Sequence, residues 1–283
     1  MHDIVFATPL GRIHALRLHP PETASAPRVL ALHGWLDNAA SFVPLSRHLH
    51  GIDLVAVDLP GHGRSAHLPP GADYSFAGTV NAVLDMADAL GWDTFALLGH
   101  SMGAGIASLA AAACPQRITR LVAIEALGAL SEVPERTVER MREAVAATRA
   151  LPGKRLRVLP DVDTATRARM QSNGLSEPVA RLLAERGVRA VEGGYTWSSD
   201  PRLTLPTMQR MTEGQINDLV AGIACPTRVI FADPAQPYLP DALRRARVAL
   251  LPQGELIVLD GTHHLHMEDP QTVADAIGDF FRS

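Results

Sequence analysis

Short apolar runs alternate with longer helical patterns over most of the chain. This alternation is typical of a mostly parallel sheet that is covered by helices on both faces. We expect strands, the first two forming a hairpin, over residues 4–7, 11–18, 28–34, 53–61, 94–99, 118–126, 227–233 and 255–261. We expect helices over residues 39–49, 75–90, 102–114, about 240–249 and about 270–281.

The alternation changes in the middle of the chain. Between residues 128 and 217, strand-like runs vanish, and charged helical stretches are interrupted by prolines and by Gly193-Gly194. We interpret this segment as a helical cap inserted over the edge of the sheet. The predicted organisation is a first part of the core over residues 1–127, a cap over 128–217 and a second part of the core over 218–283.

Length, composition and charge limit the classes of protein to which this chain can belong. The chain has 283 residues, of which 47% are hydrophobic, enough for a substantial buried core. The net charge is -4 and no basic run is interleaved with aromatic residues, so we expect no nucleic-acid partner. No segment approaches the roughly 20 apolar residues that span a bilayer, and the start lacks the pattern of a secretion signal. We therefore expect a soluble cytoplasmic protein without a membrane partner.

A serine in a glycine-rich turn is the first candidate for chemistry. The segment Gly99-His100-Ser101-Met102-Gly103 fits the pattern G-x-S-x-G, in which a sharp turn between a strand and a helix exposes the serine oxygen. The pattern is short and its residue types are common. Because a serine hydroxyl is a poor nucleophile until a base takes its proton, a nucleophilic Ser101 requires a histidine and a group that orients it.

Histidines follow the last expected strand, at the sheet edge where ligands bind in open α/β sheets. His263, His264 and His266 are all candidates for the base. Three histidines this close also suggest a metal, but the chain has no H-E-x-x-H motif and no obvious carboxylate beside them. Cys114 and Cys225 form no C-x-x-C pair, so neither a disulfide framework nor a cysteine zinc site is indicated. We expect no metal and no cofactor.

An oxyanion that forms when serine attacks a carbonyl needs two backbone donors. The N–H of Met102 follows the serine directly and is the first candidate. The second is the N–H of Trp35, because Gly34 ends an expected strand and lets the backbone turn toward the site. By itself, Gly34 is also an ordinary glycine at the end of a strand.

Four segments in this order and spacing resemble the α/β-hydrolase superfamily and, within it, the serine hydrolase-like esterase branch. They are LHGWLDNAASF (32–42), VAVDLPGHGRS (55–65), LLGHSMGAG (97–105) and GTHHLHMEDP (261–270). The resemblance spans most of the chain outside the expected cap and implies the α/β-hydrolase fold. It implies that Ser101 is the nucleophile, that His263 is the base, and that Trp35 and Met102 give the oxyanion amides. His263 is favoured because it lies seven residues before Pro270, as the catalytic histidine does in related proteins.

The position of the carboxylate that would orient the histidine departs from the commonest pattern of the superfamily. Many relatives carry an aspartate about nine positions beyond the proline that corresponds to Pro226, where this chain has Ala235. Asp233 is the nearest substitute, two residues earlier. Other members place the acid after the preceding strand, 24 residues beyond the nucleophile, and Glu125 has this spacing from Ser101. We favour Glu125 and keep Asp233 as the alternative.

The resemblance implies a cofactor-free serine hydrolase that cleaves carboxylic esters through an acyl-enzyme. An acyl thioesterase or a carbon-carbon bond hydrolase with the same triad is an alternative, and the substrate is then a small ester or thioester. A ligand-binding protein with vestigial turnover is an alternative of another class, suggested by the displaced acid. Trp197, Tyr195 and Met208 are apolar enough to line an acyl pocket, although their segment also suits a packed loop.

Overall fold

The structure is a computed structural model that describes residues 1–21, 23, 25–151 and 157–282. Among these residues, eight strands form one sheet in the order β1-β2-β4-β3-β5-β6-β9-β10, and two more form a separate hairpin. The strands are β1 (His2–Thr8), β2 (Gly11–His19), β3 (Arg28–Leu32), β4 (Asp53–Val57), β5 (Phe95–His100), β6 (Ile118–Ile124), β7 (Val188–Val191), β8 (Gly194–Trp197), β9 (Thr227–Asp233) and β10 (Gly254–Asp260).

The large sheet is parallel except at one side. Strand β2 pairs antiparallel with both β1 and β4, whereas every pair from β4 to β10 is parallel. Strands β4 and β5 are buried along their whole length, as expected for strands covered on both faces. The predicted α/β fold with a mostly parallel central sheet is confirmed.

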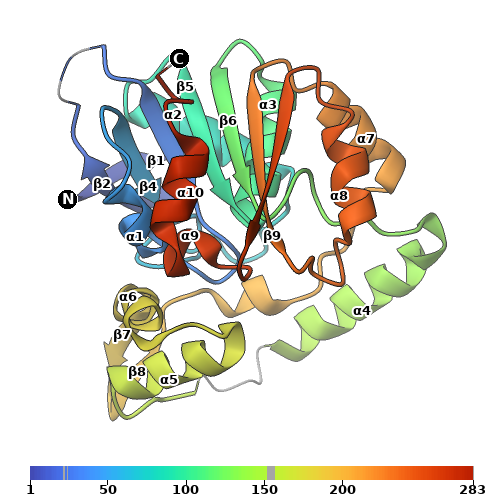
Figure 1. The fold of residues 1–283 in the computed structure, drawn as a ribbon. Helices are drawn as coiled ribbons and strands as arrows, with labels where there is room; N and C mark the ends of the chain where they lie inside the picture. The colour runs from blue at the N-terminus through green and yellow to red at the C-terminus, as the bar shows by residue number, and fades with distance from the viewer. Residues whose placement is uncertain (22, 24, 152–156, 283) are drawn as a thin grey trace.

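Helices cover both faces of the sheet (Figure 1). One buried cluster joins the sheet to α2, α3 and α7, and a second joins its other face to η1, α1 and α10. Among the described residues, the helices are η1 (Ala39–Phe42), α1 (Val43–Ser46), α2 (Gly78–Ala89), α3 (Met102–Ala113), η2 (Pro134–Arg136), α4 (Thr137–Ala150), α5 (Val162–Asn173), α6 (Glu177–Gly187), η4 (Pro201–Thr204), α7 (Glu213–Ala221), α8 (Asp241–Val248), α9 (Leu265–Glu268) and α10 (Pro270–Ile277).

The helix expected over residues 39–49 is shorter than predicted. The structure has a 3-10 turn, η1, capped by the Asn38 side chain, and then the four-residue helix α1. The Ser46 hydroxyl donates to the carbonyl of Val43, a local bond that competes with continued helix.

The segment between β6 and β9 carries helices α4 to α7, but it also contains strands. The expectation that strands vanish between residues 128 and 217 is wrong, because β7 and β8 form an antiparallel hairpin. Gly193 and Gly194 supply the turn with φ values of +82° and +143°, which residues with a side chain rarely adopt. Residues 152–156 of the expected cap lie outside the described residues.

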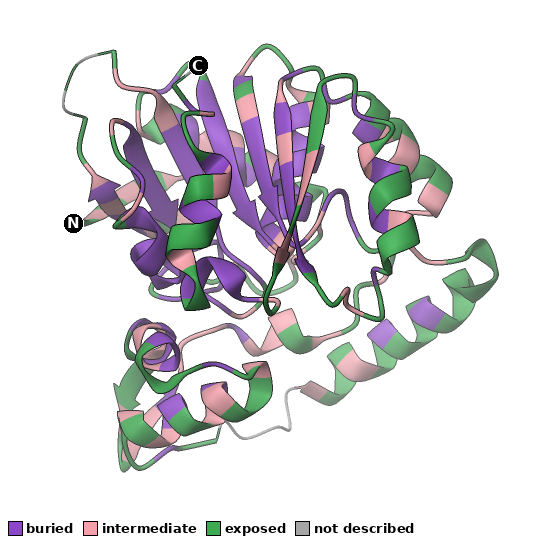
Figure 2. Cartoon of the chain, in the orientation of Figure 1, coloured by how far each residue is buried: buried purple, intermediate pink, exposed green. Residues whose placement is uncertain are grey.

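Figure 2 shows that buried residues are concentrated in the sheet, whereas α4 is largely exposed. Figure 1 shows α4, α5 and α6 at the end of the sheet where the parallel strands terminate. Across the described part of the chain, no helix is both long and apolar enough to cross a membrane.

Candidate active site

Ser101 lies on the turn between β5 and α3. Its φ of +51° and ψ of -117° are strained for a residue with a side chain, and its N–H donates to the carbonyl of Ile124 at 2.8 Å. The turn requires the flanking glycines. A Cβ at Gly99 would lie 2.4 Å from the Cα of Ala104, and one at Gly103 would lie 2.0 Å from the carbonyl oxygen of Leu32. The G-x-S-x-G spacing therefore places the serine at the end of a parallel strand and the start of a helix.

His263 lies in the loop between β10 and α9, where it faces the serine. Its Nε2 is 2.9 Å from the Oγ of Ser101, and its Nδ1 is 2.9 Å from the Oε2 of Glu125. A carboxylate only accepts hydrogen bonds, so Nδ1 carries the proton and Nε2 is left as the acceptor for the serine hydroxyl. This tautomer is the one that a base for Ser101 requires.

Glu125 follows the last residue of β6, and its side chain is fully buried. One carboxylate oxygen accepts the N–H of Ala232 at 2.5 Å, and the other accepts from His263. The buried guanidinium of Arg244, on α8, lies 3.8 Å from the second oxygen. These contacts satisfy both oxygens of the buried carboxylate and fix its orientation toward His263.

Asp233 does not occupy this position. It is the exposed last residue of β9, and its carbonyl accepts the N–H of Gly261. Glu125 follows β6, the parallel neighbour of β9, and its carboxylate contacts His263 instead. The role of Glu125 as the catalytic acid remains a prediction.

Three residues at the site have strained backbones. In the described part of the chain, the non-glycine residues with positive φ are Leu36, Ser101 and Glu125, with values of +59°, +51° and +62°. Sparsely populated backbone conformations of this kind cost on the order of 1–3 kcal/mol each. Such strain persists only where surrounding contacts enforce it, and it concentrates at functional sites.

The loop of residues 34–38 follows β3 and carries the expected oxyanion donor Trp35. The N–H of Asp37 donates to the carbonyl of Gly34 at 3.1 Å, which closes a four-residue turn. Strained Leu36 occupies its third position, where some turns require positive φ and favour glycine. We call residues 34–38 the oxyanion loop; the roles of the Trp35 and Met102 amides as donors remain predictions.

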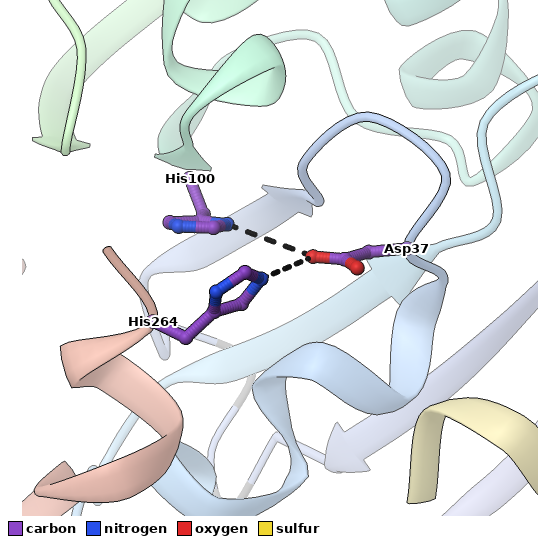
Figure 3. Close-up of side chains that lie close together, drawn as sticks. All are labelled: Asp37, His100 and His264. Atoms are coloured by element: carbon purple, nitrogen blue, oxygen red, sulfur yellow. Dashed lines mark hydrogen bonds and ion pairs between the residues drawn. The ribbon is translucent and has the colours of Figure 1, made fainter. Parts of the chain in front are cut away.

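A buried polar cluster joins Asp37 of the oxyanion loop to His100 and His264 (Figure 3). The Nε2–H of His264 donates to the Oδ2 of Asp37 at 3.2 Å, and the Nδ1 of His100 lies 3.9 Å from the same oxygen. The Nε2–H of His100 donates to the carbonyl of His263 at 2.8 Å. This neutral tautomer fits the burial of His100, which lowers its pKa well below the ordinary value, with a further contribution from the His266 ring.

The carboxylate of the cluster stays charged. Burial opposes the ionisation of Asp37, but the hydrogen bond from His264 and the positive charge of Arg169 outweigh it and hold the pKa of Asp37 well below its ordinary value. The guanidinium of Arg169, on α5, lies 3.2 Å from the Oδ1 of Asp37. The cluster also contains the carboxylate that the sequence did not show beside the histidines.

Asp37, His100 and His264 offer donor atoms within 4.8 Å of one another and are the candidate ligand set for a metal. The present contacts already satisfy the charge of this set, because Arg169 balances Asp37 and His264 donates to it. A divalent cation here would have to approach a buried guanidinium. The cluster is therefore better suited to positioning loops than to holding a cation.

A second buried ion pair joins the segment inserted between β6 and β9 to the loop that follows β4. The guanidinium of Arg186, on α6, donates to both carboxylate oxygens of Asp58, at 2.9 and 3.1 Å. Asp58 also accepts the N–H groups of Ala39 and Arg64, at 2.8 and 2.9 Å. Asp58 thus anchors the start of η1, immediately after the oxyanion loop.

The three residues proposed to line an acyl pocket lie on the inserted segment. Trp197 and Tyr195 are on β8, and Met208 lies between η4 and α7. The Trp197 ring packs beside a small apolar cluster of the cap and lies 5.7 Å from the guanidinium carbon of Arg169. Their contact with substrate remains a prediction.

The sequence did not reveal three of the charged groups around the site. Asp37 lies within one of the segments that carry the resemblance, so its position was visible but its partners were not. Arg169 and Arg244 are indistinguishable in the sequence from the many exposed arginines on neighbouring helical positions. Only the packing of α5 and α8 against the core identifies them.

Comparison with known proteins agrees with this architecture. The family model described as the alpha/beta hydrolase fold matches residues 27–270. A serine hydrolase-like protein of Dictyostelium discoideum is 30% identical over 271 residues, covering 90% of this chain and 75% of the relative. Lipase LipV of Mycobacterium tuberculosis is 31% identical over 271 residues, covering 94% of this chain and 96% of the relative.

A solved structure extends the likeness to the whole chain. The crystal structure of the hypothetical protein PA1622 from Pseudomonas aeruginosa has a TM-score of 0.92 and 38% identity, covering 100% of both chains. The matches span the core and the inserted segment together. The chain belongs to the α/β hydrolase fold family and to its serine hydrolase-like branch.

Proposed function

We propose that the protein hydrolyses carboxylic esters of small molecules through an acyl-enzyme on Ser101. The observation that carries the proposal is the unbroken chain of hydrogen bonds from Ser101 through His263 to the buried Glu125, with both distances at 2.9 Å. The likeness to a lipase favours an ester as substrate, because a lipase acts on ester bonds. The hydrolase family membership supports the same class of reaction.

The mechanism follows from the donors and acceptors. The Nε2 of His263 takes the hydroxyl proton as the Oγ of Ser101 attacks the ester carbonyl, and the carbonyl electron pair moves onto oxygen. Glu125 stabilises the resulting imidazolium, and the amides of Trp35 and Met102 stabilise the oxyanion. The oxyanion collapses, the alcohol leaves with the proton from His263, and the acyl group stays on Ser101. A water molecule then gives a proton to His263 as its oxygen attacks the acyl carbon. The bond between that carbon and the Oγ of Ser101 breaks, the acid leaves, and His263 returns the proton to Oγ.

The test is hydrolysis of p-nitrophenyl esters from acetate to long acyl chains by the wild type and Ser101→Ala. We expect the wild type to turn over part of the series and the variant to lose roughly 10³-fold or more of the rate, because it lacks the nucleophile. In parallel, a fluorophosphonate should label wild-type Ser101 stoichiometrically. Wild-type turnover that survives Ser101→Ala would contradict the proposal.

Failure of the wild type on every ester is the other informative result. Labelling of Ser101 without ester turnover would direct the same triad toward thioesters or carbon-carbon bonds. Folded protein that is neither labelled nor active would favour a ligand-binding role.

A further inference from the structure

The oxyanion loop belongs to the core in sequence, yet it is bonded to the inserted segment at successive residues. These hydrogen bonds reach η4, α5 and α6, which are three different elements of the cap. They run from the Trp35 indole N–H to the Leu203 carbonyl (2.8 Å), from the Arg169 guanidinium to the Leu36 carbonyl, and from the Asn38 amide to the Leu183 carbonyl (2.9 Å). Hydrogen bonds to the inserted segment therefore hold the oxyanion loop along most of its length.

Arg169 makes the central contact of this set. Its guanidinium donates to the carbonyl of Leu36 and lies 3.2 Å from the carboxylate of Asp37, so one side chain holds two adjacent loop residues. Its side chain is nine-tenths buried. Trp197 and Asn173 hold the guanidinium from the cap side, Asn173 by a 3.2 Å hydrogen bond. A planar guanidinium with several fixed donors suits this double contact, and an ammonium does not.

The residue that Arg169 holds is also the strained one. Leu36 has a φ of +59° at the third position of the turn from Gly34 to Asp37. Without an external partner, a leucine would relax toward negative φ. Relaxation would rotate the peptide unit between Trp35 and Leu36 and would shift the backbone of Trp35, whose N–H is the proposed donor. The direction of that N–H decides whether it can reach a developing oxyanion.

The far side of the loop is fixed by the core. Asp37 accepts from His264, the residue next to His263, and faces His100, the residue next to Ser101. Arg169 thus completes a set of contacts whose other members adjoin the nucleophile and the base. A displacement of α5 removes the only cation that balances Asp37 among the described neighbours of its carboxylate.

We propose that Arg169 is a positioning residue through which the cap sets the oxyanion loop, so that the Trp35 amide is aligned for catalysis only while α5 is docked. This inference rests on the proposed esterase function. It makes the cap part of the machinery that stabilises the transition state, in addition to any role in enclosing the acyl group.

The experiment compares Arg169→Ala and Arg169→Lys with the wild type on the best p-nitrophenyl ester. We expect Arg169→Ala to lower kcat about 10- to 100-fold with a nearly unchanged KM, because a misaligned donor weakens binding of the transition state more than of the substrate. Arg169→Lys should recover part of the loss. An alkyl trifluoromethyl ketone forms a tetrahedral oxyanion on Ser101, and its affinity should fall by the same factor as kcat.

Two further variants separate positioning from folding. Arg140→Ala is the matched control: it removes a mostly buried arginine of α4 that pairs with Glu132, away from the loop, and should leave kcat unchanged. Leu36→Gly removes the strain, since glycine adopts positive φ freely. We therefore expect Arg169→Ala to cost less kcat in the Leu36→Gly background, and thermal unfolding should verify that each variant is folded.

The proposal is overturned if folded Arg169→Ala keeps wild-type kcat, if its defect lies only in KM, or if the loss is identical in the Leu36→Gly background. If Arg169→Ala does not fold, Arg169→Lys with the ketone decides, and full affinity for the ketone would refute the positioning role. A wild type that neither cleaves esters nor binds the ketone refutes the proposed function itself.

Discussion

The two halves of the candidate site are held in different ways. Ser101, His263 and Glu125 follow the carboxyl ends of core strands and contact one another directly. The oxyanion loop also follows a core strand, but its contacts lead outward to the cap. Under the proposed function, the core holds the serine, the base and the acid, whereas the alignment of the proposed oxyanion donors depends on the inserted segment. We therefore expect changes in that segment to alter the rate as well as the substrate preference.

The largest expected effect tests the core half. Glu125→Gln should lower kcat by roughly 10³-fold, because an amide cannot stabilise the imidazolium and can hold His263 in the wrong tautomer. The measurement is the steady-state rate on the best p-nitrophenyl ester, with the fold checked by circular dichroism. Asp233→Asn is the matched control, since this exposed carboxylate lies at the end of the neighbouring strand. A collapse of turnover in Asp233→Asn alone would show that the acid is misassigned.

A prediction of intermediate size concerns the free energy of unfolding at acid pH, which depends on two buried histidines near the oxyanion loop. Burial lowers the pKa of His33 to about 4 and that of His62 to about 3. Between the ordinary value of 6.5 and these values, the unfolded chain binds protons that the folded protein does not, so stability falls as pH falls. Each of these histidines should lower the free energy of unfolding by about 2 kcal/mol when the pH falls from 7 to 5. Urea unfolding across this range measures the loss.

His33→Gln tests the assignment of this pH dependence. The variant should lose about 2 kcal/mol less than the wild type between pH 7 and pH 5, whatever its stability at neutral pH. His2→Gln, at an exposed position, is the matched control. Equal slopes for His33→Gln and the wild type would mean that the buried ring is not the source of acid sensitivity.

The smallest effect is expected on α4, the part of the cap that lies away from the loop. Val138, Met141 and Val145 are exposed there. Val145→Ser should change the unfolding free energy by less than about 0.5 kcal/mol and leave kcat unchanged. Val179→Ser makes the same change at a buried position of α6 and should cost at least about 1 kcal/mol. A loss of kcat in Val145→Ser would extend the coupling between cap and site to α4.

The predictable features of this protein are local ones. The glycines around Ser101 lie only four positions apart, and the strain and close packing of the turn follow from that spacing. The α/β order was equally readable, because strand and helix periods repeat along the core. The β7-β8 hairpin was missed because its strands are only four residues long and lie in a charged segment.

The contacts between the inserted segment and the oxyanion loop were not predictable, because they join residues that are far apart in the sequence. Arg169 meets Leu36 across 133 residues, and nothing in the surrounding letters distinguishes it from an arginine that faces solvent. The sequence left two candidates for the carboxylate that contacts His263 for a related reason. Glu125 follows β6 and Asp233 ends β9, and these two strands pair side by side, so both carboxylates lie at the same edge of the sheet.

The buried pair of Arg186 and Asp58 limits how this scaffold can be re-engineered. A cap grafted from another hydrolase without an arginine at this point would leave the carboxylate of Asp58, which has no exposed surface, without its cation. Breaking such a pair typically costs about 3–5 kcal/mol, a large share of a domain's stability. Successful chimeras should therefore either carry the arginine with the transplanted cap or replace Asp58 by asparagine in the recipient.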